Sequence, residues 1–151
     1  MKKFQFSLEK VLEVKEIEEK ILQRDLLLIQ KEIIDQENKI LDNQEKISQE
    51  RINLSVLNQK GTDSAEIMMH YKYLDSLHKK MEILMTDLKA LTVKEEKIKS
   101  MLVIKSQEKK SLDRLKEIKY DEFRKNYKKQ QQILLDEVSI QNFRMKQENH
   151  K

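Results

Sequence analysis

The segment Lys60-Gly61-Thr62-Asp63-Ser64-Ala65-Glu66 contains the only glycine of a chain that has no proline. Glycine just past the end of a helix is the usual left-handed stop. Asp63 followed three residues later by Glu66 has the spacing of a capping box, which opens a new helix. A stop that is directly followed by a start predicts one tight reversal here, with helix on both sides.

The composition of the whole chain supports this architecture. Charged residues make up 38% of the 151 residues, aromatic residues only 5%, and cysteine and tryptophan are absent. This composition, combined with helical periodicity, is typical of coiled coils. Disorder is the competing interpretation, because the mean hydropathy is low at −0.79. The lack of cysteine excludes a disulfide framework and cysteine-based zinc sites, and it fits a reducing cytosol.

An apolar repeat of 3.5 residues on each side of the glycine argues against disorder. Eight of eleven repeat positions before the glycine are apolar, and nine of eleven after it. Sustained over about five heptads, this spacing predicts a left-handed supercoil. The predicted seam positions are Leu22, Leu26, Ile29, Ile33, Gln36, Ile40, Asn43, Ile47, Glu50, Leu54 and Leu57, then Ile67, His70, Leu74, Leu77, Met81, Leu84, Leu88, Leu91, Glu95, Ile98 and Leu102.

The two stripes share one antiparallel register. Facing residues in such a hairpin have numbers with a constant sum, and Ile33 with Leu91 gives 124, as does Leu57 with Ile67. Continued outward, this register sets Glu19 against Lys105, Leu12 against Leu112, and Lys15 against Lys109. We therefore predict an interhelical ion pair at the first of these positions and a loosened seam at the last.

Three polar residues interrupt the first stripe at intervals of seven. The register sets Gln36, Asn43 and Glu50 opposite Leu88, Met81 and Leu74. Polar seam residues reduce stability but fix register and oligomeric state. A long charged side chain is expected to keep its head in water at the edge of the seam. His70, in the other stripe, is expected to be a satisfied edge histidine.

The predicted fold is all-α: residues 1–151 form a single antiparallel coiled-coil hairpin, with helices over about 7–60 and 64–147 and a turn at 61–63. Pairing ends near Phe4 opposite Tyr120, so about thirty residues of the second helix overhang without a partner in the chain. Apolar residues continue through this overhang, and several share one helical face. Those are Phe123, Tyr127, Leu134, Val138 and Met145. Such a helix needs another protein, a second copy or a lipid surface.

The sequence offers no chemistry beyond binding. His78 and His150 lack suitably spaced partners, His70 is assigned to the seam, and one glycine cannot build a phosphate-binding loop, so no catalytic residue, cofactor or metal site is predicted. The longest apolar runs have four residues, far short of the roughly 20 that span a bilayer. Residues 101–151 carry 13 Lys and Arg against 8 Asp and Glu. That basic excess leaves nucleic-acid binding as an alternative, although no nucleic-acid partner is expected.

Both ends of the chain resemble a known family. Phe4-Gln5-Phe6-Ser7-Leu8-Glu9-Lys10-Val11-Leu12, followed by a Glu-rich turn, is similar to the opening of the flagellar export protein FliJ family. Leu115-Lys116-Glu117-Ile118-Lys119-Tyr120-Asp121-Glu122-Phe123-Arg124, together with the later Leu135-Asp136-Glu137, resembles that family's closing stretch. The middle of the chain is generic coiled coil and identifies nothing.

The resemblance implies a non-enzymatic component of flagellar type III export. Members are similar to the stalk subunit of rotary ATPases: they associate with the hexameric export ATPase and the cytoplasmic domain of the export gate, and they help recycle export chaperones. It implies a cytoplasmic protein peripherally associated with the inner-membrane export apparatus, with no small-molecule substrate. An injectisome stalk homologue remains an alternative, as does a structural homodimer whose helices run straight through Gly61.

Geometry combined with this resemblance gives two sets of candidate contact residues. The candidates for the ATPase ring lie at the paired ends of the chain: Phe4, Phe6, Leu8, Leu12, Lys15, Tyr120, Phe123 and Arg124. The candidates for the export gate lie near the turn: Tyr71, Tyr73, Leu77 and Lys80.

Overall fold

The structure, a computed structural model, describes residues 2–150 and contains two helices, α1 (Glu9–Lys60) and α2 (Ser64–Asn149). No strand occurs among these residues, and the predicted all-α helical hairpin is confirmed. The residues group into two compact units. We call residues 19–104 the hairpin unit, and residues up to Glu18 together with those from Lys105 onward the terminal unit.

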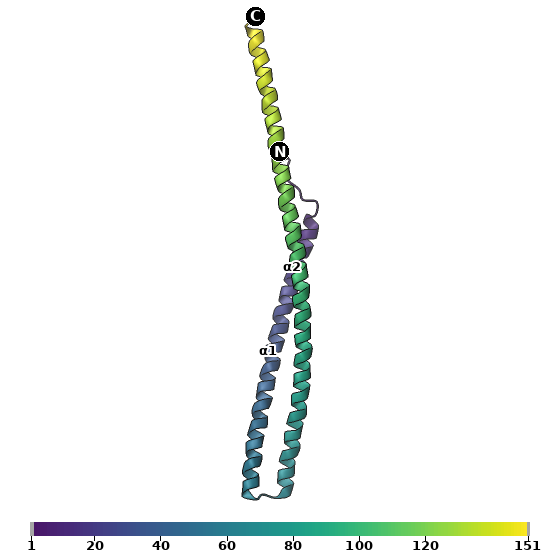
Figure 1. Cartoon of the computed structure of the whole chain (residues 1–151), viewed down its shortest axis with the longest axis vertical. Coiled ribbons are helices and arrows are strands. Elements are labelled where there is room, and N and C mark those ends of the chain that lie inside the picture. Colours follow the sequence, from purple (N-terminus) through teal and green to yellow (C-terminus); the bar gives the residue numbers. More distant parts are fainter. Residues whose placement is uncertain (1, 151) are drawn as a thin grey trace. The chain divides into compact units, whose positions relative to one another are not determined.

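The turn of the hairpin unit is built as its sequence predicts (Figure 1). Gly61 follows the last residue of α1 and has φ of 69°, in the left-handed region. The amide of Thr62 donates to the carbonyl oxygen of Leu57 at 3.5 Å, and the Thr62 hydroxyl donates to the same oxygen at 3.2 Å. This bond from two residues past the helix end is the Schellman pattern, and it satisfies a terminal carbonyl of α1.

A carboxylate caps the start of α2. Asp63 Oδ1 accepts a hydrogen bond from the amide of Ala65 at 3.3 Å, which is the bond an N-cap residue makes to the second helical residue. Glu66, the other half of the expected box, has an exposed side chain and places its negative charge in the first turn of the helix. A negative charge there also stabilises the helix through its interaction with the positive end of the helix dipole.

Gly61→Ala is expected to lower the unfolding free energy by about 1–2 kcal/mol, the cost of a left-handed backbone for a residue with a Cβ. No heavy atom lies within 4 Å of the position that the new Cβ would take, so packing adds nothing to this cost. Urea denaturation followed by circular dichroism measures it. Gly61→Asn is the control and should retain most of the stability, because Asn tolerates this conformation. Equal stability of the Ala variant and the parent would contradict the turn geometry.

The helices of the hairpin unit are held together by the predicted seam. Every seam position from Leu22 to Leu57 and from Ile67 to Leu102 is buried or half-buried. The buried apolar members are Ile29, Ile40, Ile47, Leu54, Leu77 and Leu84. The 3.5-residue repeat in the sequence is therefore the contact repeat in the structure.

Gln36, Asn43 and Glu50, which we call the polar ladder, are buried in this seam at 8%, 1% and 5% exposure. Gln36 Nε2 donates to the carbonyl oxygen of Leu84 and Asn43 Nδ2 to that of Leu77, both at 3.0 Å. A helical carbonyl points toward the amide four residues later. These two bonds therefore lie beside Leu88 and Met81, the residues that the predicted register sets opposite.

Glu50 differs from its expected place at the edge of the seam. Its carboxylate lies 2.5 Å from His70 Nδ1 and is buried, whereas the imidazole is half-buried. The seam can hold this carboxylate because a hydrogen-bonding partner reaches it from the other helix, and a buried polar group without one would be costly. His70 is thus the satisfied edge histidine that the sequence predicts.

In the terminal unit, a non-helical segment precedes α1 and lies along α2. Phe6 and Leu12 are buried, at 9% and 3% exposure. Within this unit α2 continues well past the N-terminal segment (Figure 1), and every described residue from Lys128 onward is exposed. The overhang is therefore helical and has no apolar neighbour within the described part of the unit.

Candidate partner-binding surfaces

Aromatic side chains hold the N-terminal segment against α2. The Phe4 ring packs edge-to-face on Tyr120, with centroids 5.3 Å apart and an interplanar angle of 74°. It also lies 5.6 Å from Phe123, which stacks on Tyr127 at 6.4 Å. These separations are favourable for aromatic pairs. Three of the predicted ring-contact residues are thus brought together, with one ring from the N-terminal segment and two from α2.

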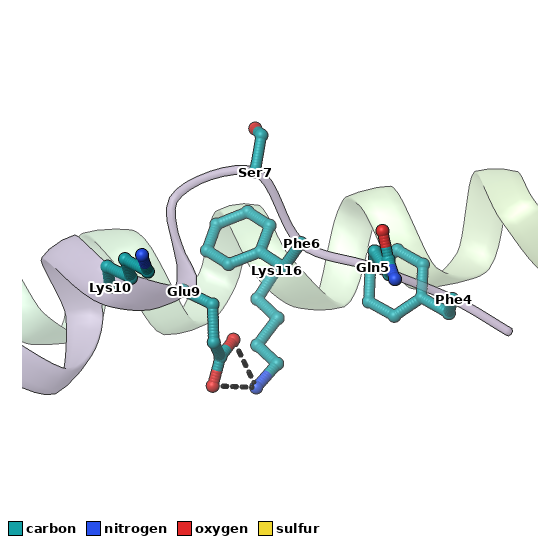
Figure 2. Close-up of a pocket in the computed structure, with 7 residues that line it drawn as sticks. All are labelled: Phe4, Gln5, Phe6, Ser7, Glu9, Lys10 and Lys116. Carbon is teal, nitrogen blue, oxygen red and sulfur yellow. Dashed lines mark hydrogen bonds and ion pairs between the residues drawn. The ribbon is translucent and has the colours of Figure 1, made fainter.

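An open hollow of about 560 Å³ lies between this segment and α2, and its lining residues are Phe4, Gln5, Phe6, Ser7, Glu9, Lys10 and Lys116. Figure 2 shows Glu9 and Lys116 pointing toward one another. Lys116 Nζ lies 2.8 Å from one carboxylate oxygen of Glu9 and 3.1 Å from the other. The hydrogen bond to Glu9 raises the pKa of Lys116 above its ordinary value.

Four charged residues with alternating signs join α1 to α2 in the terminal unit. Lys15 Nζ lies 2.7 Å from Glu108, and Lys105 Nζ lies 2.8 Å from Glu18. Two longer contacts of 3.8 Å, from Lys15 to Glu18 and from Lys105 to Glu108, complete the cluster. The expected loosening of the seam at Lys15 is therefore wrong, because Glu108, one residue before the expected like charge, supplies a carboxylate. Likewise, Lys105 forms its ion pair with Glu18, which lies one residue before the predicted partner Glu19.

These hydrogen bonds shift the pKa values of the cluster. The bond from Lys105 lowers the pKa of Glu18, and the bond from Lys15 lowers that of Glu108. The bond to Glu18 raises the pKa of Lys105. Each of these pKa shifts favours the charged form of the group. Partial desolvation shifts the pKa in the opposite direction, but its effect is smaller than that of the hydrogen bond. The cluster thus stabilises the terminal unit while all its members are ionised.

We expect pairing in the terminal unit to weaken at both pH extremes. The carboxyl contribution is complete above the ordinary pKa of 4.5 and is lost as pH falls through the lowered values. The lysine contribution is complete below 10.5 and is lost as pH rises through the raised values. The chain has no cysteine, so spin labels at Val11→Cys and Arg114→Cys report the separation. The label distance should be narrow between these limits and broad outside them.

The matched control for this titration is Glu18→Gln with Glu108→Gln. Without the two carboxylates, the acid loss of pairing should be smaller, and the label distance should be broader at neutral pH than in the parent. An unchanged distance in acid for the parent, or an identical acid response in the variant, would contradict the role given to the cluster.

The remaining predicted ring-contact residues divide between buried and accessible positions. Phe6 and Leu12 are buried within the terminal unit, so their side chains serve its folding. Leu8 has 37% exposure, and Arg124 is exposed. Tyr120, with 46% exposure, is accessible as well, so Leu8, Tyr120 and Arg124 are the candidates that leave most side-chain surface to a partner, whereas the Phe4 ring is half-buried against α2.

The predicted gate-contact residues lie in the hairpin unit, on the first turns of α2. Tyr71 and Tyr73 have 52% and 48% exposure, and Lys80 is exposed. Leu77 is buried at 5% exposure because it occupies a seam position, so its side chain is not offered to a partner. Met69, with 72% exposure, lines a small hollow with Tyr73, Glu50 and His70. From the sequence, Met69 could be recognised only as a methionine that lies outside the seam.

The overhang carries the densest exposed apolar surface of the terminal unit. Its large apolar side chains are between 52% and 64% exposed: Ile133, Leu134, Leu135, Val138, Ile140, Phe143 and Met145. Soluble proteins rarely leave contiguous apolar surface uncovered unless it binds something. This surface is therefore the strongest structural candidate for a partner contact.

No other kind of site is found in the part of the chain that the structure describes. No group of three or more His, Asp or Glu side chains there could hold a metal ion. Neither helix contains, over residues 2–150, a stretch that is long and apolar enough to cross a membrane.

The fold and these surfaces define the class: an all-helical antiparallel hairpin with exposed apolar ends. A comparison with family models matches residues 4–148 to that of the flagellar FliJ protein. This match spans nearly the whole chain, and the protein belongs to the FliJ family. No curated protein and no solved structure matches the chain. Family membership makes the protein a component of flagellar protein export and indicates a cytoplasmic location.

Proposed function

We propose that the protein is a non-enzymatic stalk that couples the hexameric export ATPase to the cytoplasmic domain of the export gate. The overhang and the paired ends of the terminal unit would contact the ATPase ring, and the exposed tyrosines near the turn would contact the gate. The protein would be peripherally associated with the inner-membrane export apparatus, and it would assist the recycling of export chaperones. Membership in the flagellar family favours flagellar export over an injectisome.

The observation that carries this proposal is the distribution of apolar residues around the overhang. At 3.6 residues per turn, Leu134, Val138 and Met145 share one face, whereas Ile133, Ile140 and Phe143 lie roughly 100° to 180° around the helix from Leu134. A single partner helix or a flat lipid surface covers one face of a helix. A socket that surrounds the helix, such as the centre of a ring, covers both. The second group was not part of the face that the sequence singles out.

The region near the turn supports a second contact by different chemistry. Tyr73 is half-exposed beside Met69, Tyr71 is half-exposed two residues earlier, and Lys80 follows about two turns after Tyr73 along α2. Tyrosine is enriched in binding hot spots because it offers a rigid apolar body with a polar tip. This patch suits a globular protein domain better than nucleic acid, since it has few basic residues.

Retention of the export ATPase on immobilised protein tests the ring contact. Leu134→Ser with Phe143→Ser should weaken retention at least about tenfold, because buried anchors at an interface dominate its affinity. Both side chains are exposed in the free chain, so circular dichroism should be unchanged. The matched control is Ile83→Ser with Val93→Ser, which replaces equally exposed residues of the hairpin unit.

Two outcomes would reject this assignment. If the parent chain retains no ATPase, the coupling role fails. If the parent retains it and the overhang variant does so equally well, the ring contact lies elsewhere. The gate contact is tested by the same retention assay. Retention of the isolated gate domain is compared between the immobilised parent and the double variant Tyr71→Ala with Tyr73→Ala.

A further inference from the structure

A second hollow, of about 540 Å³, lies beside Phe4 and is lined by Asp113, Lys116, Glu117 and Tyr120. The α2 residues fall at spacings of three and four, so they share one helical face. The Phe4 and Tyr120 rings, whose centroids are 5.3 Å apart, both line the hollow. Two carboxylates and two aromatic rings are thus gathered around one open space in the terminal unit.

The charges that line this hollow do not cancel. Lys116 is neutralised by Glu9, which holds its ammonium at 2.8 Å. The carboxylate of Asp113 acts on Lys116 only at longer range. Among the residues that the structure describes, no hydrogen bond or ion pair engages the carboxylates of Asp113 and Glu117. Like charges four residues apart on a helix repel one another, and these two carboxylates have no ion-pair partner inside the hollow, although Lys109, Lys110 and Arg114 lie within one turn of them on α2.

We propose that this hollow is a socket for an arginine side chain of a partner protein. A guanidinium group is planar, so it stacks on aromatic rings while its N–H groups donate to carboxylates in a fixed fork. An ammonium lacks that plane and is more strongly hydrated. The two carboxylates repel phosphate, which argues against nucleic acid and anionic lipid as occupants. The inference rests on the proposed function only for the identity of the partner, the export ATPase.

Titration of the full chain with N-acetyl-arginine amide tests the socket without any partner. In nitrogen-15 NMR spectra, this probe should shift the amide signals of Asp113 to Tyr120, and N-acetyl-lysine amide should shift them less at equal concentration. Asp113→Asn with Glu117→Gln should weaken binding of the arginine probe about tenfold, because it removes charge-assisted hydrogen bonds. The matched control is Asp121→Asn with Glu137→Gln, which removes two carboxylates of α2 outside the hollow and should bind like the parent.

The absence of shifts with the arginine probe would overturn the proposal, as would equal shifts with the lysine probe. An Asn and Gln variant that binds like the parent would overturn it as well. The same variants are then compared for ATPase retention. If the probe binds but the parent retains no ATPase, the socket stands and the proposed function fails. If the ATPase is retained equally by all variants, the ring contact stands and the arginine does not come from the ATPase.

Discussion

Asn43→Asp is expected to lower the unfolding free energy by about 3–5 kcal/mol at neutral pH, the range for an uncompensated buried charge. The Asn43 side chain has 1% exposure, and its amide donates to the carbonyl oxygen of Leu77. A carboxylate there would lose this donor and would face that oxygen inside an apolar seam. Burial disfavours the charged form, so part of the stability should return in acid, where the new carboxyl is protonated and can donate again. Urea denaturation at neutral and acid pH measures both effects.

Two variants serve as controls for this result. Asn38→Asp makes the same change at an exposed position of the same helix and should alter stability by no more than about 0.5 kcal/mol. Asn43→Leu should stabilise the hairpin by about 1–3 kcal/mol, because Asn43 Oδ1 accepts no hydrogen bond among residues 2–150. A parent-like stability of Asn43→Asp at neutral pH would show that this seam position is open to water.

Leu77→Ala is expected to cost about 2–5 kcal/mol, the range for truncating a buried leucine. Leu77 has 5% exposure and lies between the helices of the hairpin unit, where the loss of its side chain leaves a void. The melting temperature and the urea midpoint should both fall. Ile83→Ala is the matched control, since Ile83 is 62% exposed on the same helix and its truncation should change stability by no more than about 0.5 kcal/mol.

This second result also bears on the gate contact. Leu77 is one of the four residues that the sequence assigns to the gate, yet it belongs to the seam. Weak gate binding by Leu77→Ala would therefore reflect a destabilised hairpin. Tyr73→Ala removes an exposed side chain and tests the contact without this complication. If Leu77→Ala were as stable as Ile83→Ala, the predicted register would be wrong.

The hairpin could be predicted from the sequence because burial in a coiled coil follows from position alone. Once Gly61 sets the turn, each residue three or four further along must face the other helix, so even Gln36 and Asn43 could be placed in the seam. Their hydrogen-bond partners could not be predicted. Local geometry decides whether a side-chain amide donates its hydrogen bond to a side chain or to a backbone carbonyl, and the heptad repeat contains no information on that geometry.

The candidate surfaces could be predicted only in part, for a related reason. The aromatic residues at both ends are visible in the sequence, but aromatic spacing does not tell whether Phe4 binds a partner or packs on Tyr120 in the same chain. Flexible lysines such as Lys15 reach a carboxylate one residue away from the position directly opposite. The register therefore predicts which segments meet, and side-chain reach decides which charges pair.

The polar ladder has a mechanical consequence for the hairpin unit. Purely apolar side chains slide past one another at little cost, because similar contacts form again one heptad later. The amides of Gln36 and Asn43 and the carboxylate of Glu50 each hold one fixed atom on α2, so a lengthwise pull on one helix strains all three bonds together. Under tension along its length, the hairpin should resist shear as one piece until the three bonds rupture at once.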